Sequence, residues 1–94
     1  MPFVYMMANE RNGTLYIGVT NDLIRRVYEH KTDAVPSFTS RHQLHNLVWC
    51  EYAAEIRSAI QREKRLKNWK RHWKIQLIEQ TNLHWHDLYP ALLS

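Results

Sequence analysis

The sequence is poor in the residues that build disulfide frameworks, phosphate-binding loops and membrane spans. Its 94 residues include one cysteine and two glycines. Cys50 cannot form an internal disulfide, and its apolar neighbours indicate a core position in a protein of a reducing cytoplasm. No Gly-rich phosphate loop, cysteine pair or serine nucleophile elbow is present, which excludes most nucleotide-binding and acyl-transfer enzymes.

No apolar run approaches the ~18 residues of a membrane span, and nothing at the N-terminus resembles a signal peptide. We therefore expect a cytoplasmic protein without a membrane partner. The hydrophobic fraction of 45% and the four tryptophans indicate a packed globule. A chain of this length suffices for one small core, so residues 1–94 are expected to form a single domain. The formal net charge of +4 mildly favours an anionic partner.

The apolar patterns predict a mixed fold of short strands and amphipathic helices. Strands are expected over residues 3–8, 14–19 and 47–52, with helices covering at least one face of the sheet. Helices are expected over about residues 22–31, 53–68 and 71–80. Asn12-Gly13 signals a hairpin, but a tight turn and a longer loop give different registers, so the pairing of Tyr5 and Tyr16 stays open.

The segment from residue 32 to 46 is polar, contains Pro36 and has no clear period. Loops of this length in compact domains are often functional. The tail over residues 82–94 is too apolar for a free tail and is expected to pack on the body. In the helix before it, Trp73 and Leu77 are expected to face inward.

Two polar side chains adjoin the apolar face of the first predicted helix. Thr20, Asn21 and Asp22 are residues that cap helix starts. At about 100° per residue, Arg26 and His30 then fall beside the apolar face of Leu23 and Val27. A guanidinium and an imidazole at the edge of a core-facing stripe are costly unless something there needs them. Gly18, just before this helix, allows a partner backbone or a ligand to come close.

Glu63 lies in the middle of the apolar face of the second predicted helix. That face is formed by Ile56, Ala59, Ile60 and Leu66. A carboxylate aimed at a core needs a cation, a metal or a raised pKa. The residue by itself is compatible with an ion pair, for instance with Arg26, and with a ligand to Mg²⁺, which often takes only one or two carboxylates plus waters.

Most of the positive charge lies in one helical region. Eight of the 13 Lys and Arg residues occur between Arg57 and Lys74, and only Glu63 opposes them. Trp69 and Trp73 are interleaved with these cations. Basic residues with aromatic rings suit a nucleic acid, whose phosphates bind cations and whose bases stack on rings. Among the six histidines, the pairs His42 with His45 and His84 with His86 lack the spacing of a structural zinc module and are interpreted as surface residues.

Short motifs with one order and spacing run through nearly the whole chain. They are Phe3-Val4-Tyr5, Tyr16-Ile17-Gly18, Arg26 with His30, Phe38-Thr39, and Arg62-Glu63-Lys64. In this set the chain resembles the GIY-YIG nuclease family, in particular its small stand-alone members. Phe3 stands where the first motif is named for Gly, and Leu83 stands where small relatives commonly have Pro after Asn82.

The resemblance implies an α/β (α+β) fold with a three-stranded antiparallel sheet flanked by helices. It also implies hydrolysis of DNA phosphodiester bonds that depends on Mg²⁺ or Mn²⁺, without a small-molecule cofactor. Glu63 would hold the ion, Tyr16 would assist activation of the attacking water, and Arg26 would stabilise charge on the scissile phosphate. Tyr5 and His30 would be neighbours in the proton network.

The basic helices would then form the DNA track. The residues assigned to it are Arg62, Lys64, Arg65, Lys67, Lys70, Arg71 and Lys74. Phosphate contacts carry no sequence information, so we expect a structure-selective or weakly sequence-specific endonuclease of DNA repair or processing. The alternatives are a nucleic-acid-binding module that no longer cuts and a protein-interaction domain that uses the aromatic tail. The oligomeric state and a role for Asn82 stay open.

Overall fold

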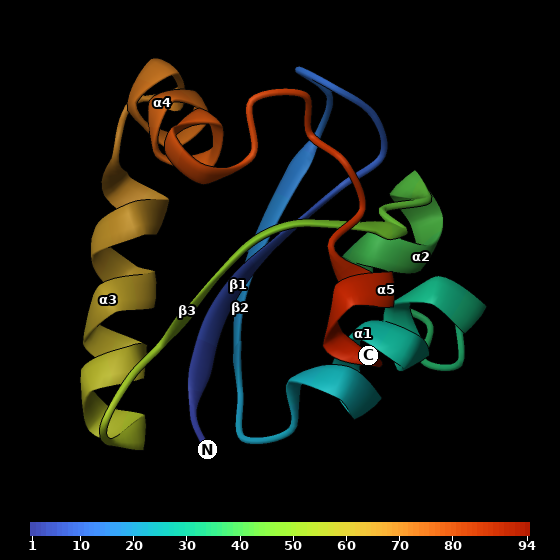
Figure 1. The fold of residues 1–94 in the computed structure, drawn as a ribbon, viewed down its shortest axis with the longest axis horizontal. Coiled ribbons are helices and arrows are strands. Elements are labelled where there is room, and N and C mark those ends of the chain that lie inside the picture. Colours follow the sequence, from blue (N-terminus) through green and yellow to red (C-terminus); the bar gives the residue numbers. More distant parts are fainter.

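A computed structural model describes residues 1–94 as a small sheet with helices on both faces (Figure 1). The strands are β1 (Phe3–Ala8), β2 (Leu15–Thr20) and β3 (Asn46–Tyr52). The helices are α1 (Leu23–Thr32), α2 (Phe38–His42), α3 (Ile56–Asn68), α4 (Arg71–Thr81) and α5 (Tyr89–Leu92). The predicted α+β fold with a three-stranded antiparallel sheet is confirmed. None of the helices has the length and apolar character that crossing a membrane requires.

β1 is the central strand and pairs antiparallel with β2 on one side and β3 on the other. Residues 9–14 connect β1 and β2 as a longer loop, which settles the register that the sequence left open. Tyr5 lies opposite Gly18, and Tyr16 lies opposite Met7. Because directly paired residues point to the same face of a sheet, both tyrosines lie on one face.

The sheet separates two hydrophobic cores, since successive strand residues point to opposite faces. The first core, beneath α3 and α4, includes Val4, Met6, Ala8, Ala59, Leu66 and Ile78. The second core, beneath α1, contains Tyr5, Met7, Leu23, Val27, Leu44 and Leu47. Cys50 packs half-buried against this second core. In Figure 1, α3 and α4 accordingly lie on one side of the sheet, and α1, α2 and α5 lie on the other.

The C-terminal tail packs on the body, as its composition predicts. Trp85 is buried in the first core. The side-chain amide of Asn82 donates to the carbonyl oxygens of Val48 and His86, at 3.1 and 2.8 Å. Its Oδ1 accepts a hydrogen bond from the backbone N–H of His86 at 3.0 Å. These bonds tie the tail to β3, so the structure gives Asn82 an architectural role.

The prediction of which helix residues face the core is partly wrong. Ile56, Ile60 and Trp73 have exposed fractions of 43, 40 and 45%. The reason is geometric: a sheet of three strands covers only a narrow stripe of α3, and Ala59 and Leu66 fill that stripe. The polar segment after α1 also contains a short helix, α2, which the absence of a period concealed.

Candidate active site

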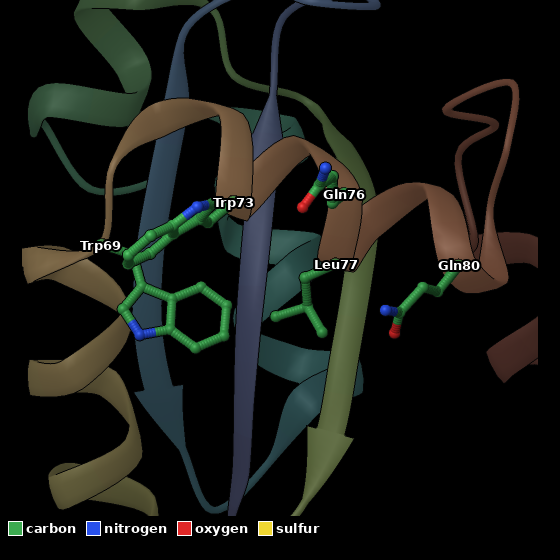
Figure 2. Close-up of a pocket in the computed structure, with 5 residues that line it drawn as sticks. All are labelled: Trp69, Trp73, Gln76, Leu77 and Gln80. Atoms are coloured by element: carbon green, nitrogen blue, oxygen red, sulfur yellow. The ribbon is translucent and has the colours of Figure 1, made fainter.

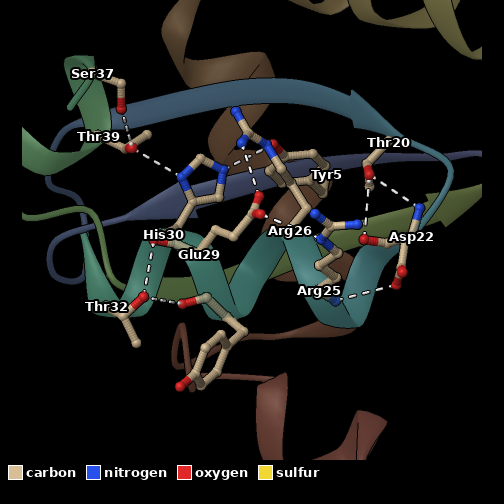
Figure 3. A network of polar contacts seen from close by, with 11 residues as sticks. Tyr5, Thr20, Asp22, Arg25, Arg26, Glu29, His30, Thr32, Ser37 and Thr39 are labelled. Carbon is tan, nitrogen blue, oxygen red and sulfur yellow. Dashed lines mark hydrogen bonds and ion pairs between the residues drawn. The ribbon is translucent and has the colours of Figure 1, made fainter. Parts of the chain in front are cut away.

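α1 begins at the predicted cap and carries two of the predicted site residues. The Asp22 carboxylate accepts a hydrogen bond from the backbone N–H of Arg25 at 3.2 Å, which satisfies one of the free N–H groups at the helix start. Val27 is buried against the sheet. Arg26 and His30, four residues apart, lie on one side of the helix and face the end of the Tyr5 side chain (Figure 3).

The centre of the site is a buried hydrogen-bonded pair, Tyr5 and His30. The Tyr5 hydroxyl lies 2.9 Å from His30 Nε2, and the two residues are 1% and 4% exposed. Burial raises the pKa of Tyr5 to about 12. Burial, together with the nearby charge of Arg26, lowers the pKa of His30 to about 4. Both side chains are therefore neutral at pH 7.

Tyr16 lies beside this pair but is only partly buried. Its ring centroid is 6.2 Å from that of Tyr5 and 5.6 Å from that of His30. A Cβ atom at Gly18 would lie 2.6 Å from the Tyr5 Cζ and hydroxyl and 2.9 Å from Tyr16 Cε2. The space at Gly18 is thus filled by the Tyr5 phenol, rather than by a partner backbone or a ligand.

Arg26 places a positive charge beside the buried pair of Tyr5 and His30. Its side chain is 32% exposed, and one guanidinium nitrogen lies 3.2 Å from the Glu29 carboxylate. The guanidinium also lies near the Tyr5 hydroxyl (Figure 3), and this nearness lowers the pKa of Tyr5 by less than burial raises it. Burial lowers the pKa of Arg26, but the contacts with Tyr5 and Glu29 raise it by more. Glu29 also pairs with Arg25 at 3.4 Å, so one carboxylate is shared between two cations and charge remains for an anion.

Glu63 approaches the site from α3, which packs against the edge strand β2. Its side chain is 20% exposed. Its negative charge raises the pKa of Tyr5, and this is the smallest of the influences on that pKa. Glu63 makes an ion pair with Lys67, one turn along α3 at 3.6 Å; Arg26, the example of a cation partner given above, pairs with Glu29 instead.

The donor set around Glu63 suits one kind of metal ion. No group of three or more His, Cys, Asp and Glu side chains lies close enough together to hold an ion by itself. Mg²⁺ and Mn²⁺ bind through oxygen ligands, and Mg²⁺ commonly takes one or two carboxylates with waters and substrate phosphates. A single, partly exposed carboxylate such as Glu63 fits such an ion once a phosphate is present.

A groove of about 270 Å³ runs beside the site at the edge of β2. Tyr16 and Phe38 form an aromatic wall, with ring centroids 6.4 Å apart and nearly parallel planes. Lys67 and Lys74, from α3 and α4, add two cations to the lining. The groove gives a polyanion a route to Tyr16.

The seven basic residues assigned to DNA differ in their surroundings. Arg62 pairs with Glu51 at 3.0 Å. Arg71 donates to the carbonyl oxygens of Asn12 and Gly13 in the hairpin loop, at 2.8 and 2.5 Å. Both arginines therefore also hold the fold together. The exposed members whose side chains make neither an ion pair nor a hydrogen bond are Lys64, Arg65 and Lys70.

A second groove, of about 300 Å³, lies on α4 (Figure 2). It is lined by Trp69, Trp73, Gln76, Leu77 and Gln80. The two indole rings are nearly perpendicular, with centroids 6.2 Å apart. Arg62 lies over the Trp69 ring, and Lys70 lies over the Trp73 ring. No residue lines both this groove and the groove at Tyr16.

His30 has a second partner to which the sequence assigned no role. Its Nδ1 lies 2.9 Å from the hydroxyl of Thr39, which is 2% exposed. The Thr39 hydroxyl lies 2.8 Å from that of Ser37. The length of the polar loop was the only local signal for this contact, because the loop has no periodicity and the partner is nine residues away.

Comparisons with known proteins agree with this arrangement. The model of the GIY-YIG catalytic domain matches residues 1–76. A UPF0213 protein of Bacillus pumilus is 35% identical over 72 residues, which cover 77% of this chain and 74% of that protein. The solution NMR structure of a UPF0213 protein from Bacillus halodurans matches with a TM-score of 0.54 and 25% identity over 87% of each chain. The resemblance in the motifs is confirmed, and the chain belongs to the GIY-YIG family.

Proposed function

We propose that this protein is an endonuclease that uses Mg²⁺ or Mn²⁺ to hydrolyse DNA phosphodiester bonds. GIY-YIG proteins are generally nucleases that depend on a divalent metal. The observation that carries the proposal is the division of the site into two layers. Tyr16 and Arg26 are partly exposed beside the buried neutral pair of Tyr5 and His30, and the charge of the partly exposed Glu63 acts on Tyr5 from α3.

The three partly exposed groups take the roles that contact the substrate. Arg26 stabilises the negative charge that grows on the scissile phosphate, because a guanidinium donates strong, charge-assisted hydrogen bonds to phosphate oxygens. Tyr16 assists removal of the proton from the attacking water. Glu63 would hold the divalent ion, which would polarise the phosphate and neutralise charge on the leaving oxygen.

Tyr5 and His30 serve as positioning residues, since neither side chain reaches solvent. Tyr5 lies near the Arg26 guanidinium and packs beside Tyr16, so it can hold both groups toward one point. A displacement of about 1 Å in such a site can cost roughly 10²-fold in rate.

The groove at Tyr16 and the exposed cations form the path of the DNA. Lys67 and Lys74 line the groove, and further cations lie on α3 and at the start of α4. Contacts to phosphates position a duplex without reading its bases. We therefore propose a structure-selective or weakly sequence-specific enzyme that acts in DNA repair or processing in the cytoplasm.

The test is cleavage of nicked, branched and linear DNA with Mg²⁺, with Mn²⁺ or with a chelator. Wild-type protein should cut only with metal. Glu63→Gln should remove metal-dependent cutting and leave DNA affinity within about twofold. Glu55→Gln is the matched control, because Glu55 is an exposed carboxylate at the N-cap of the same helix, two turns before Glu63; this variant should cut at the wild-type rate.

Two outcomes would reject the proposal. Equal cutting by the Glu63 variant would remove the assigned metal ligand. DNA binding by wild-type protein without cutting on any substrate or metal would favour the non-catalytic nucleic-acid-binding module.

A further inference from the structure

A continuous chain of hydrogen bonds leads from the site to the first residues of α2 and its N-cap (Figure 3). It joins Tyr5 to His30 at 2.9 Å, His30 to Thr39 at 2.9 Å, and Thr39 to Ser37 at 2.8 Å. No buried side-chain nitrogen or oxygen in the protein lacks a partner. Each of the four side chains can donate and accept, so the direction of the chain has to be argued from its ends.

The Tyr5 end sets the direction. Tyr5 keeps its proton at pH 7, and as a buried hydroxyl it needs an acceptor for that proton. Arg26 is a donor only, so it cannot accept the proton. The acceptor within hydrogen-bond distance is Nε2 of His30, which must then be unprotonated. Neutral His30 therefore carries its proton on Nδ1 and donates it to Thr39, whose own proton is directed to Ser37.

We propose that Thr39 is a positioning residue of the active site, which accepts the Nδ1 proton of His30 and thereby holds the imidazole in the tautomer that accepts from Tyr5. Ser37 acts behind Thr39, because its hydroxyl accepts the Thr39 proton and orients the Thr39 lone pairs toward His30. Ser37 is itself fixed, since its backbone N–H donates to the Ser40 hydroxyl at 2.8 Å.

The tautomer decides how Arg26 is held. With the proton on Nδ1, the Tyr5 oxygen has its lone pairs free to accept from the Arg26 guanidinium. With the proton on Nε2, His30 would compete with Arg26 as a donor to the Tyr5 oxygen, and the Tyr5 proton would have no acceptor at His30. Thr39 thus sets whether Tyr5 presents an acceptor to Arg26. The kinetic part of this inference rests on the proposed nuclease function, and the tautomer itself does not.

The direct test is the tautomer of His30 in the ¹⁵N-labelled wild-type protein, measured at pH 7 by long-range ¹H–¹⁵N correlation. The expected result is a protonated Nδ1 and an unprotonated Nε2, which is opposite to the preference of free histidine in water. A protonated Nε2 would overturn the inference. This measurement needs no variant, so it decides the question even if a substitution prevents folding.

Variants at Thr39 test the causal role. Thr39→Val keeps the shape but removes the acceptor, so a measurable population of His30 should move its proton to Nε2. Thr39→Ser keeps the hydroxyl and should restore the wild-type tautomer. An unchanged tautomer in Thr39→Val would show that Thr39 does not set it.

Cleavage kinetics then connect the tautomer to the reaction. Thr39→Val should lower kcat by at least about tenfold at unchanged KM, and Thr39→Ser should recover most of the rate. A valine variant with the altered tautomer and full kcat would overturn the positioning role. If wild-type protein cuts no DNA, the proposed function fails, while the tautomer of wild type and of the valine variant still decides whether Thr39 positions His30.

Discussion

Replacing Gly18 by alanine tests the packing on which the site depends. The added Cβ would lie 2.6 Å from the Tyr5 Cζ and hydroxyl, whereas an ordinary contact begins near 3.4 Å. The phenol would have to move by close to 1 Å. Tyr5 is 1% exposed and is hydrogen-bonded to His30, so it has little room for that movement.

The expected loss of stability follows from three contributions. Overpacking a core costs about 1–3 kcal/mol. A weakened bond between Tyr5 and His30 costs about 1 kcal/mol more. Alanine regains roughly 0.5–1 kcal/mol over glycine within a strand. We expect Gly18→Ala to lower the free energy of unfolding by about 2 kcal/mol and, at roughly 4–8 °C per kcal/mol for a chain of this size, Tm by about 8–16 °C.

Urea denaturation of a double-mutant cycle assigns the cost to the phenol. Tyr5→Leu ends before the Cζ atom that the new methyl group would meet. Gly18→Ala should therefore cost less than about 0.5 kcal/mol in the Tyr5→Leu background. An equal cost in both backgrounds, or a single Gly18 variant as stable as wild type, would refute the steric argument.

Three further predictions concern pH, the tail and the DNA track. As pH falls from about 6.5 to about 4, the free energy of unfolding should fall by up to about 3 kcal/mol, because His30 binds a proton in the unfolded chain but not in the folded one. Urea denaturation at pH 7 and 4.5 measures this dependence, and His30→Gln should flatten it. Asn82→Ala should lower the free energy of unfolding by about 2 kcal/mol, because the buried Val48 carbonyl loses its donor, and specific cleavage activity should be unchanged once the fraction folded is corrected for. Lys64→Ala and Arg65→Ala should each reduce the slope of log affinity for duplex DNA against log salt by about 0.9, and unchanged slopes would remove these residues from the track.

The elements and part of the site could be predicted from the sequence because they depend on local periodicity. Arg26 and His30 stand out beside the apolar stripe of α1 at any plausible tertiary arrangement, and Glu63 stands out in α3 for the same reason. The width of a buried helix face depends on what covers it. Ile56 therefore has the period of a core residue but lies exposed, since the sheet is only three strands wide.

Contacts between segments that are distant in the sequence could not be predicted from local periodicity. The hairpin register depends on the conformation of a loop, and Asn12-Gly13 is compatible with more than one. The contact between Thr39 and His30 depends on how a loop without periodicity folds back over α1. Only the motif order, which reflects the family rather than local physics, suggested that Tyr5 and Tyr16 belong to one site.

The layered site reflects the cost of burying charge. The fold buries Tyr5 and His30, which are neutral at pH 7, and leaves Arg26 and Glu63 partly exposed, where solvent and ion pairs stabilise their charges. Tyr5 comes from the central strand, and its phenol extends over Gly18 of the edge strand, which leaves the space for it.

This arrangement makes the site depend on the β1–β2 register. A slip of one residue would turn Tyr16 to the opposite face of the sheet and place a side chain where Gly18 now leaves space for Tyr5. Arg71 bonds to two carbonyl oxygens of the hairpin loop and thus braces the segment that sets this register. A basic residue on the proposed DNA track therefore supports the candidate site through the fold, by holding the β1–β2 hairpin.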